Sequence, residues 1–154
     1  MKNIFNMCGL TALFYNPRNN LRNHLTDMAS SLCLLKRRGP DRGKMIWDEN
    51  GIIGFQRLCI NDLSDNGDQP MKEGSATLVC NGEVFNYKQL IKQYNINMKS
   101  GSDCEVILHL YHKIGFKATI EQLDGDFAVV LYDQNTIYVA RDRIGVRPLF
   151  YGKT

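Results

Sequence analysis

Cys8 is the residue of this chain whose type and surroundings most suggest covalent chemistry. It precedes Gly9 and the apolar run Leu10–Phe14, a pattern that predicts a buried strand beginning beside the thiol. If Met7 is removed, Cys8 carries a free α-amine, which titrates near about pH 8 and can act as a general base. Most cysteines in strands are only small buried hydrophobic residues. The prediction of a nucleophile therefore depends on polar motifs further along.

Three groups of polar residues at or near predicted strands and helices could bind a substrate beside Cys8. Arg57 lies within a predicted strand, Asn81-Gly82-Glu83 follows another as a polar turn, and Asp103 opens a helix. Each has a simpler explanation: a surface ion pair for Arg57, a common turn for Asn81-Gly82, and helix-dipole stabilisation of about 0.3–1 kcal/mol for Asp103. Only their combination with Cys8 favours a site.

Antiparallel hairpins and separate helices are predicted to position these groups. Leu21, Leu25, Met28, Leu32 and Leu35 form one apolar helical stripe. That helix is expected to begin at Asn16-Pro17 and to end near Arg38–Asp41. Strands are predicted at 44–47, 52–60, 75–80, 127–132 and 137–140, and short helices at 87–94 and after Ser102, which with Glu105 forms a capping box. This order indicates a layered α+β sandwich rather than βαβ units.

Composition limits the classes of function that remain. The chain has 154 residues, enough for one domain, 44% of them apolar, and a net charge of +3 without a basic stripe for nucleic acid. It has no apolar run long enough for a membrane span and no secretory signal. Five cysteines without a CxxC pair favour free thiols in a reducing compartment, hence the cytoplasm. His109 and His112 share a helix face but form no metal-ligand pattern with the cysteines.

Five segments in order carry a resemblance to a known family. They are MCG at Met7, RRGPD at Arg37, NGEVFN at Asn81, SDCEVILHLY at Ser102 and ARDRIGVRPLFYG at Ala140. Together they resemble the class II glutamine amidotransferase domain, a member of the N-terminal-nucleophile hydrolases, and most closely its form in glutamine-hydrolysing asparagine synthetases. The resemblance covers nearly the whole chain. It implies a four-layer αββα sandwich of two antiparallel sheets.

The resemblance also implies roles for individual residues. Cys8 would attack the glutamine amide, and Asn81 with the Gly82 N–H would hold the oxyanion, where losing one donor typically costs about 3–4 kcal/mol. Arg57 would bind the substrate carboxylate, and Glu83 and Asp103 its ammonium group. The backbone of Leu58, Cys59, Ile60 and Asn61 would line the same pocket, Arg38 and Asp41 would brace the loop over it, and the remaining thiols would be buried or incidental. No metal or cofactor is expected in this chain; ATP and Mg²⁺ would serve a separate synthetase domain or subunit that receives the ammonia.

Three features depart from the family pattern. Residues 1–7 precede the nucleophile as a leader or propeptide, unless translation starts at Met7, which we expect; residues 8–154 then form the amidotransferase domain. Arg37 and Gln56 replace histidines common in the family, and Asn61 replaces an aliphatic residue. The sequence reaches Thr154 without the further hairpin usual in the family, so we expect an incomplete domain, and it contains no SGGxDS-type pyrophosphate loop.

Three hypotheses follow from the sequence. The first is a glutaminase that supplies ammonia for asparagine-type amide synthesis. The second is a non-catalytic fragment or pseudoenzyme that binds glutamine or a synthetase partner. The third is an amidotransferase that serves another acceptor, as in amidophosphoribosyltransferase, glucosamine-6-phosphate synthase or glutamate synthase. Ammonia release and its dependence on an acceptor discriminate among them.

Overall fold

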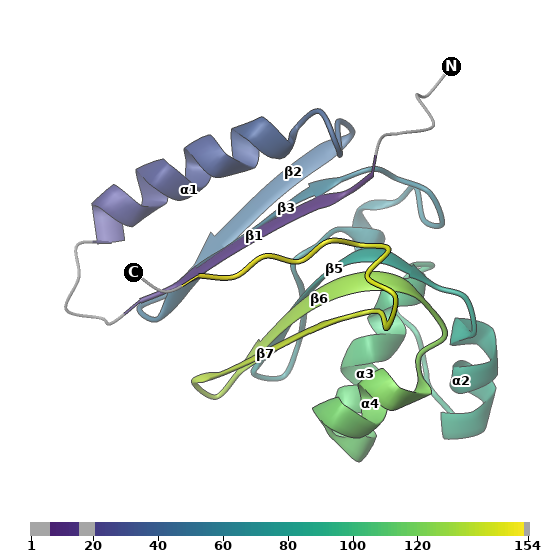
Figure 1. The fold of residues 1–154 in the computed structure, drawn as a ribbon. Coiled ribbons are helices and arrows are strands. Elements are labelled where there is room, and N and C mark those ends of the chain that lie inside the picture. The colour runs from purple at the N-terminus through teal and green to yellow at the C-terminus, as the bar shows by residue number, and fades with distance from the viewer. Residues whose placement is uncertain (1–6, 16–20, 153–154) are drawn as a thin grey trace.

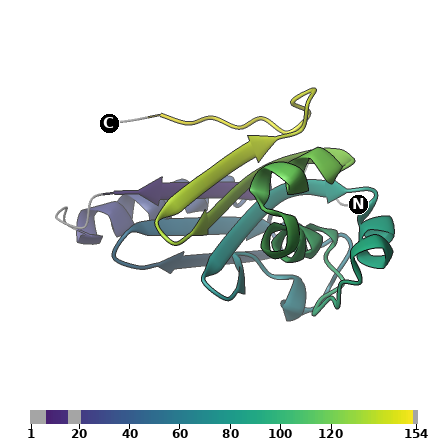
Figure 2. The same cartoon turned by 90° about the horizontal axis from the view of Figure 1, so that it is seen from below.

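Two antiparallel sheets lie face to face, with helices on both outer faces (Figure 1). This arrangement comes from a computed structural model that describes residues 7–15 and 21–152. The three-stranded sheet, in the order β1-β3-β2, packs against one helix, α1. The four-stranded sheet, in the order β4-β5-β6-β7, packs against α2, α3 and α4, which lie in front of it in the view from below (Figure 2). The predicted αββα sandwich is confirmed.

The three-stranded sheet brings the start of β1 beside the end of β3. Its elements are β1 (Gly9–Phe14), α1 (Leu21–Leu35), β2 (Arg42–Trp47) and β3 (Gly51–Arg57). In the antiparallel register Gly9 pairs with Gln56 from one side of β3, and Arg42 pairs with Arg57 from the other. The central strand β3 is buried along its whole length. Cys8, one residue before β1, therefore lies beside the chain that leaves β3.

The helix and hairpin predictions for this sheet hold, with differences at several ends; β2 begins at Arg42, two residues before the predicted start. The predicted helix start at Asn16-Pro17 lies outside the described residues, and α1 ends at Leu35, slightly before the predicted Arg38–Asp41 stop. The strand predicted to reach Ile60 ends at Arg57. Residues 58–64 leave the sheet because the side chain of Arg57 bonds to them, as described below.

One prediction for the four-stranded sheet was wrong. Its elements are β4 (Met71–Glu73), β5 (Ala76–Val84), β6 (Gly125–Asp133) and β7 (Thr136–Arg141). Asn81-Gly82-Glu83 is not a turn but the end of β5, paired with Ala128, Phe127 and Asp126 of β6. A Cβ at Gly82 would overlap the carbonyl oxygen of Asp126. Glycine therefore allows the strand to continue where its sequence resembles a turn.

The helices that cover this sheet also differ from the prediction, because α4 was not predicted and one helix start differs. They are α2 (Tyr87–Tyr94), α3 (Val106–Ile114) and α4 (Phe116–Gln122), with 3-10 helices η1 (Asp65–Gly67) and η2 (Asp103–Glu105). The predicted capping box is wrong, because Ser102 makes no side-chain cap bond. Glu105 instead accepts the N–H groups of Lys99 and Ser100, at 2.7 and 2.8 Å. The segment before η2 folds back, so that its backbone N–H groups bind the Glu105 carboxylate.

Two apolar clusters stabilise the layers. The larger lies between the four-stranded sheet and its helices and includes Leu78, Leu110 and Leu131, which are fully buried. The smaller lies between the two sheets, where Phe55 and Val79 pack together and Cys8 packs against them.

Within the described parts of the chain, no helix is both long and apolar enough to cross a membrane.

Gly39→Ala is expected to destabilise the fold by about 1–3 kcal/mol, the usual penalty for overpacking. Gly39 is buried, and a Cβ there would overlap the backbone carbonyl of Gln56 in β3. Gly152→Ala is the matched control, since nothing lies within 4 Å of a Cβ at that position. Urea unfolding monitored by circular dichroism measures both variants. Equal midpoints for the two would contradict the close approach of Gly39 to β3.

Candidate active site

The thiol of Cys8 faces the backbone of Leu58, just beyond the end of β3. The Leu58 N–H donates to the Cys8 sulfur at 3.2 Å, and the sulfur lies 3.5 Å from the Leu58 carbonyl. Arg38 Nε donates to the carbonyl oxygen of Cys8 at 3.2 Å. Cys8 is half-buried. The residue is thus held by backbone contacts on both sides while its sulfur remains at the wall of a cleft.

Burial raises the pKa of the Cys8 thiol above its ordinary value. The Leu58 N–H and the charge of Arg57 lower the pKa, but by less than burial raises it. The thiol is therefore the stable form at neutral pH, whereas the nucleophile in covalent catalysis is the thiolate. Nucleophilic attack by Cys8 needs a base that removes this proton.

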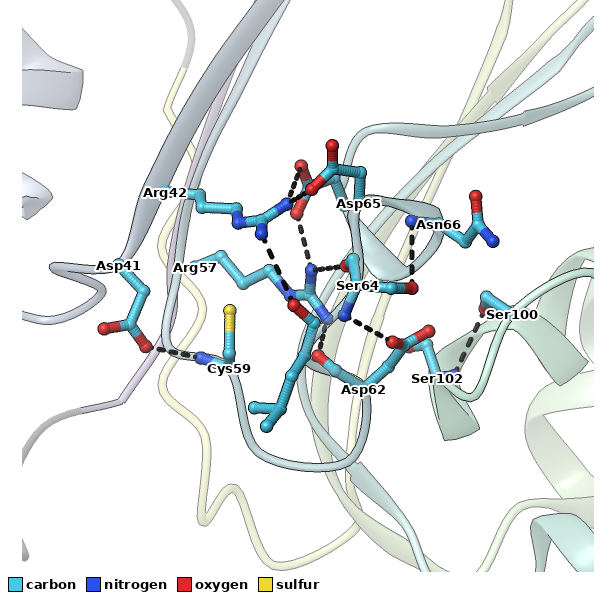
Figure 3. A network of polar contacts seen from close by, with 12 residues as sticks. Asp41, Arg42, Arg57, Cys59, Asp62, Ser64, Asp65, Asn66, Ser100 and Ser102 are labelled. Carbon is cyan, nitrogen blue, oxygen red and sulfur yellow. Dashed lines mark hydrogen bonds and ion pairs between the residues drawn. The ribbon is translucent and has the colours of Figure 1, made fainter.

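Arg57 is the most heavily bonded side chain near Cys8. Its guanidinium, in a side chain only 7% exposed, forms an ion pair with Asp68 at 2.5 Å and donates to the carbonyl oxygens of Ser64 and Asp62 (Figure 3). These contacts use both Nη1 protons and one Nη2 proton. A guanidinium has five N–H donors, so the Nε proton and one Nη2 proton have no partner among the described residues. These two donors remain available to a carboxylate.

The segment after β3 is tied down at several points. The Cys59 N–H donates to Asp41 at 2.8 Å, which confirms that Asp41 braces this segment, as Arg38 braces Cys8. Asp62 accepts the N–H groups of Ser64 and Gly101, each at 2.8 Å. The bonds from Ser64 are the main cause that lowers the Asp62 pKa. Residues 58–64 are therefore a defined wall that is joined to the loop before η2.

Two carboxylates lie on the opposite wall, in different environments. Asp103 is buried and accepts Asn61 Nδ2 at 2.7 Å and the Val84 N–H at 2.6 Å. Glu83 is half-buried at the end of β5, and its carboxylate has no bonding partner within residues 7–15 and 21–152. Glu83 is therefore available to a cation, whereas Asp103 first serves to hold Asn61 and β5.

The end of β5 brings Asn81 and Gly82 to the same region. Side chains alternate along a strand, so Asn81 shares the face of Val79, which packs in the inter-sheet cluster beside Cys8. Asn81 is buried, and its Oδ1 has no hydrogen-bond partner in the described structure. An unpaired buried polar atom costs about 1–3 kcal/mol. The Asn81 Oδ1 atom therefore makes no hydrogen bond that holds the fold together.

A cleft of about 40 Å³ joins these groups. Eight predicted residues line it: Cys8, Arg57, Leu58, Ile60, Asn61, Gly82, Glu83 and Asp103. Cys59 and Asn81, also predicted, lie next to lining residues but do not line it themselves. The sequence analysis missed Phe55, Asp62, Gly67, Gln69, Cys80, Ser102 and Cys104 as lining residues.

Some of the missed residues left a signal in the sequence and others did not. Asp62 stands two residues before Ser64, and at this spacing an aspartate side chain often accepts the backbone N–H of the later residue. Gln69 gives no such signal: its amide bonds to both the N–H and the carbonyl of Cys80, at 2.6 and 3.0 Å, across the sheet edge. The thiols of Cys80 and Cys104 are buried as predicted, while Cys33 is exposed.

The predicted leader is largely outside what the structure describes. Residues 1–6 are not among the described residues, and Met7 is joined to Cys8 by an ordinary peptide bond. Arg147 Nη1 contacts the Met7 sulfur at 3.2 Å and its guanidinium also pairs with Asp126. The start of the chain at the site is therefore in contact with the segment after β7.

Comparison with protein families identifies the domain. A family model described as a glutamine amidotransferase domain matches residues 7–154. The probable glutamine-hydrolysing asparagine synthetase of Acanthamoeba polyphaga mimivirus is 43% identical over 136 residues, which cover 82% of this chain and 25% of that protein. Glutamine-hydrolysing asparagine synthetase 2 of Bacillus subtilis is 41% identical over 121 residues, covering 74% of this chain and 16% of that protein. The chain thus spans about a quarter or less of these relatives.

A solved structure supports the same assignment of the fold. The glutamine phosphoribosylpyrophosphate amidotransferase of B. subtilis, in complex with ADP and GMP, superposes with a TM-score of 0.56 and 28% sequence identity. The match covers 64% of this chain and 24% of that chain. The similarity therefore concerns the layered domain described above and not the remainder of that enzyme.

Cys8 is expected to need a higher pH to react with iodoacetamide in the folded protein than in the same protein unfolded in urea. Burial raises the Cys8 pKa, so the reactive thiolate forms later as pH rises. Peptide mass spectrometry of samples alkylated between about pH 6 and pH 10, with and without urea, gives a Cys8 rate for each state. Equal pH profiles in the two states would show that burial does not raise the Cys8 pKa.

Proposed function

The chain belongs to the glutamine amidotransferase domain family, and we propose that it hydrolyses the side-chain amide of glutamine at Cys8 to give glutamate and ammonia. One observation carries this proposal: a thiol, a guanidinium and two carboxylates from four separate segments converge on one cleft. Free glutamine presents an amide, a carboxylate and an ammonium group. The cleft offers a complement to each of them.

Recognition of the amino-acid end of glutamine is assigned to charged groups on both walls. The two unpaired N–H donors of the Arg57 guanidinium bind the substrate carboxylate. Glu83 accepts the substrate ammonium group, and Asp103 contributes the second carboxylate while it retains Asn61 and Val84. A glutamine within a peptide lacks both charges, so this arrangement selects the free amino acid.

The chemistry proceeds through a thioester. The Cys8 sulfur attacks the amide carbon and forms a tetrahedral oxyanion, which Asn81 Nδ2 and the Gly82 N–H stabilise. The amide nitrogen takes a proton and leaves as ammonia, with the C–N bond broken and the C–S bond kept. Water then attacks the thioester, and the C–S bond breaks to release glutamate and the thiol.

The base in this scheme is the α-amine of Cys8 itself. The raised pKa of the thiol makes such a base necessary, and an α-amine is unprotonated in part near neutral pH. The amine becomes free when residues 1–7 are absent from the mature protein, and we propose that they are. With the Met7–Cys8 bond retained, the same cleft binds glutamine without turnover, which is the second candidate function.

The outer end of the cleft is exposed. Ile60 and Asn61 lie there, and Asn61 joins this wall to Asp103 through one hydrogen bond.

The use of the ammonia is also part of the proposal. Similarity to glutamine-hydrolysing asparagine synthetases favours transfer to a synthetase domain or subunit that uses ATP and Mg²⁺, and a cytoplasmic location suits the free thiols. The proposed hydrolysis itself draws on the side chains and amine of this chain. No contact with nucleic acid or membrane is part of it.

Cys8→Ala is expected to lower glutamine hydrolysis by at least about 1,000-fold, because it removes the nucleophile. Binding of glutamine, measured by isothermal titration calorimetry, should persist, since the charged groups remain. Cys33→Ala is the control and should retain full activity. Equal turnover by wild type and Cys8→Ala would refute the assignment of the nucleophile.

Glu83→Gln is expected to raise the KM for glutamine by roughly 30-fold or more, because it leaves the substrate ammonium group unpaired. The kcat of Glu83→Gln should change much less. Asp124→Asn, at an exposed carboxylate, is the matched control. If Glu83→Gln changed kcat alone, Glu83 would not bind the ammonium group.

Intact mass and N-terminal sequencing of the protein isolated from its native context show whether the α-amine of Cys8 is free. We expect an N-terminus at Cys8 together with glutaminase activity. A retained Met7 in a protein that binds but does not hydrolyse glutamine would establish the second candidate instead.

A further inference from the structure

A second cavity, of about 290 Å³, lies on the side of the sandwich where the edges of the two sheets meet. One edge is β2 of the three-stranded sheet and the other is β4 of the four-stranded sheet. Side chains of α3 and of the segment 65–73 complete it. It is several times larger than the cleft at Cys8 and shares none of the catalytic groups proposed above.

The acidic groups at one end of this cavity lie beside basic side chains. His109 lies between two carboxylates, with Nδ1 3.1 Å from Glu73 and Nε2 3.0 Å from Glu105. Lys99 lies 3.7 Å from Glu73. The hydrogen bonds from residues 99 and 100 lower the pKa of Glu105 although burial opposes them. The Glu105 carboxylate is thus satisfied by hydrogen bonds, whereas Glu73 Oε2 is buried without a hydrogen-bond partner in the described structure.

The acidic groups at the other end also lie beside basic side chains. Arg42 pairs with Asp65 and lies 3.3 Å from Asp68, and Asp68 also holds Arg57 (Figure 3). All four lining carboxylates thus face arginine, lysine or histidine.

Two lysines remain without a partner. Lys44 on β2 and Lys72 on β4 both line the cavity, are exposed, and form no ion pair or hydrogen bond within the described structure. The walls between them include apolar side chains, among them Ile46, Met71 and Leu108. The cavity therefore combines uncompensated positive charge with an apolar interior, and a ligand that fits it carries a negative group and an uncharged body.

We propose that this cavity binds a small organic anion, a carboxylate or a phosphate ester, through Lys44 and Lys72. We further infer, on the basis of the proposed glutaminase function, that the bound anion weakens glutamine binding. The two sites share a wall: Asp65 and Asp68 line the cavity, while Gly67 between them lines the cleft at Cys8.

The coupling runs through Asp68. Its Oδ1 accepts from Arg57 and its Oδ2 from Arg42. An anion in the cavity attracts the Arg42 guanidinium away from Asp68. Asp68 then pairs with Arg57 alone. Arg57 is then held more firmly by the protein and attracts the substrate carboxylate less. The result is a higher KM for glutamine at unchanged kcat.

Binding is tested with the Cys8→Ala protein, so that the result does not depend on turnover. Succinate and methyl phosphate are titrated separately while ¹⁵N–¹H spectra are recorded at constant ionic strength, because exposed charge pairs are screened by salt. We expect saturable shifts for at least one probe at Lys44, Lys72 and Leu108. Succinate alone indicates a carboxylate ligand, methyl phosphate alone a phosphate ester, and both a general anion site.

The variant Lys44→Gln/Lys72→Gln is expected to bind the probe roughly 10-fold more weakly, since each exposed charge contributes only modestly. Lys117→Gln, which removes an exposed lysine on α4, should bind as tightly as the parent. Thermal unfolding confirms that the variants are folded. Absence of saturable shifts, or equal affinity in the double variant, overturns the site.

Coupling is measured in the protein with Cys8 intact. Saturating probe should raise the KM for glutamine several-fold, and the effect should disappear in Lys44→Gln/Lys72→Gln but not in Lys117→Gln. An unchanged KM with a saturated cavity overturns the coupling. Probe binding by a protein without glutaminase activity would contradict the proposed function while leaving the anion site in place.

Discussion

The buried guanidinium of Arg57 is the group on which the arrangement of the site depends. It leaves the end of β3 and binds Asp68, Ser64 and Asp62, all from the segment that follows the strand. Removing one partner of a buried ion pair typically costs about 3–5 kcal/mol, because the other charge is left uncompensated. The chain after β3 therefore has little freedom to follow another path.

Several features of the cleft follow from that path. Leu58 comes to lie against Cys8, where its N–H reaches the sulfur. Gly67 passes so close to the guanidinium that a Cβ would overlap Arg57 Nη2. Asp62 reaches across to the Gly101 N–H and links this wall to the loop that carries Asp103. One cation thus positions the backbone beside the Cys8 thiol and the wall opposite the carboxylates.

The environment of Cys8 explains why its chemistry needs a partner group. A half-buried thiol among apolar neighbours is stable in the protonated form, which favours the fold but not nucleophilic attack. Within the described residues no histidine is bonded to this sulfur, and its hydrogen-bonding contacts are backbone atoms of Leu58. The proposed base, the α-amine of Cys8 itself, would need no change in the apolar packing around the thiol.

The sequence by itself determined the layered α+β class, most elements of both sheets, and eight of the residues that line the cleft. These follow from local periodicity and from motifs whose order resembles a family, and the family model and the relatives agree with that family. It did not determine the end of β3, the path of β5 through Asn81-Gly82-Glu83, or the role of Glu105. Each of these depends on a partner distant in the chain: Asp68 for Arg57, β6 for Gly82, and the folded-back segment 99–100 for Glu105. Tertiary structure alone also placed β2 beside β4 and so created the second cavity, because the approach of two sheet edges leaves no periodic signal in either strand.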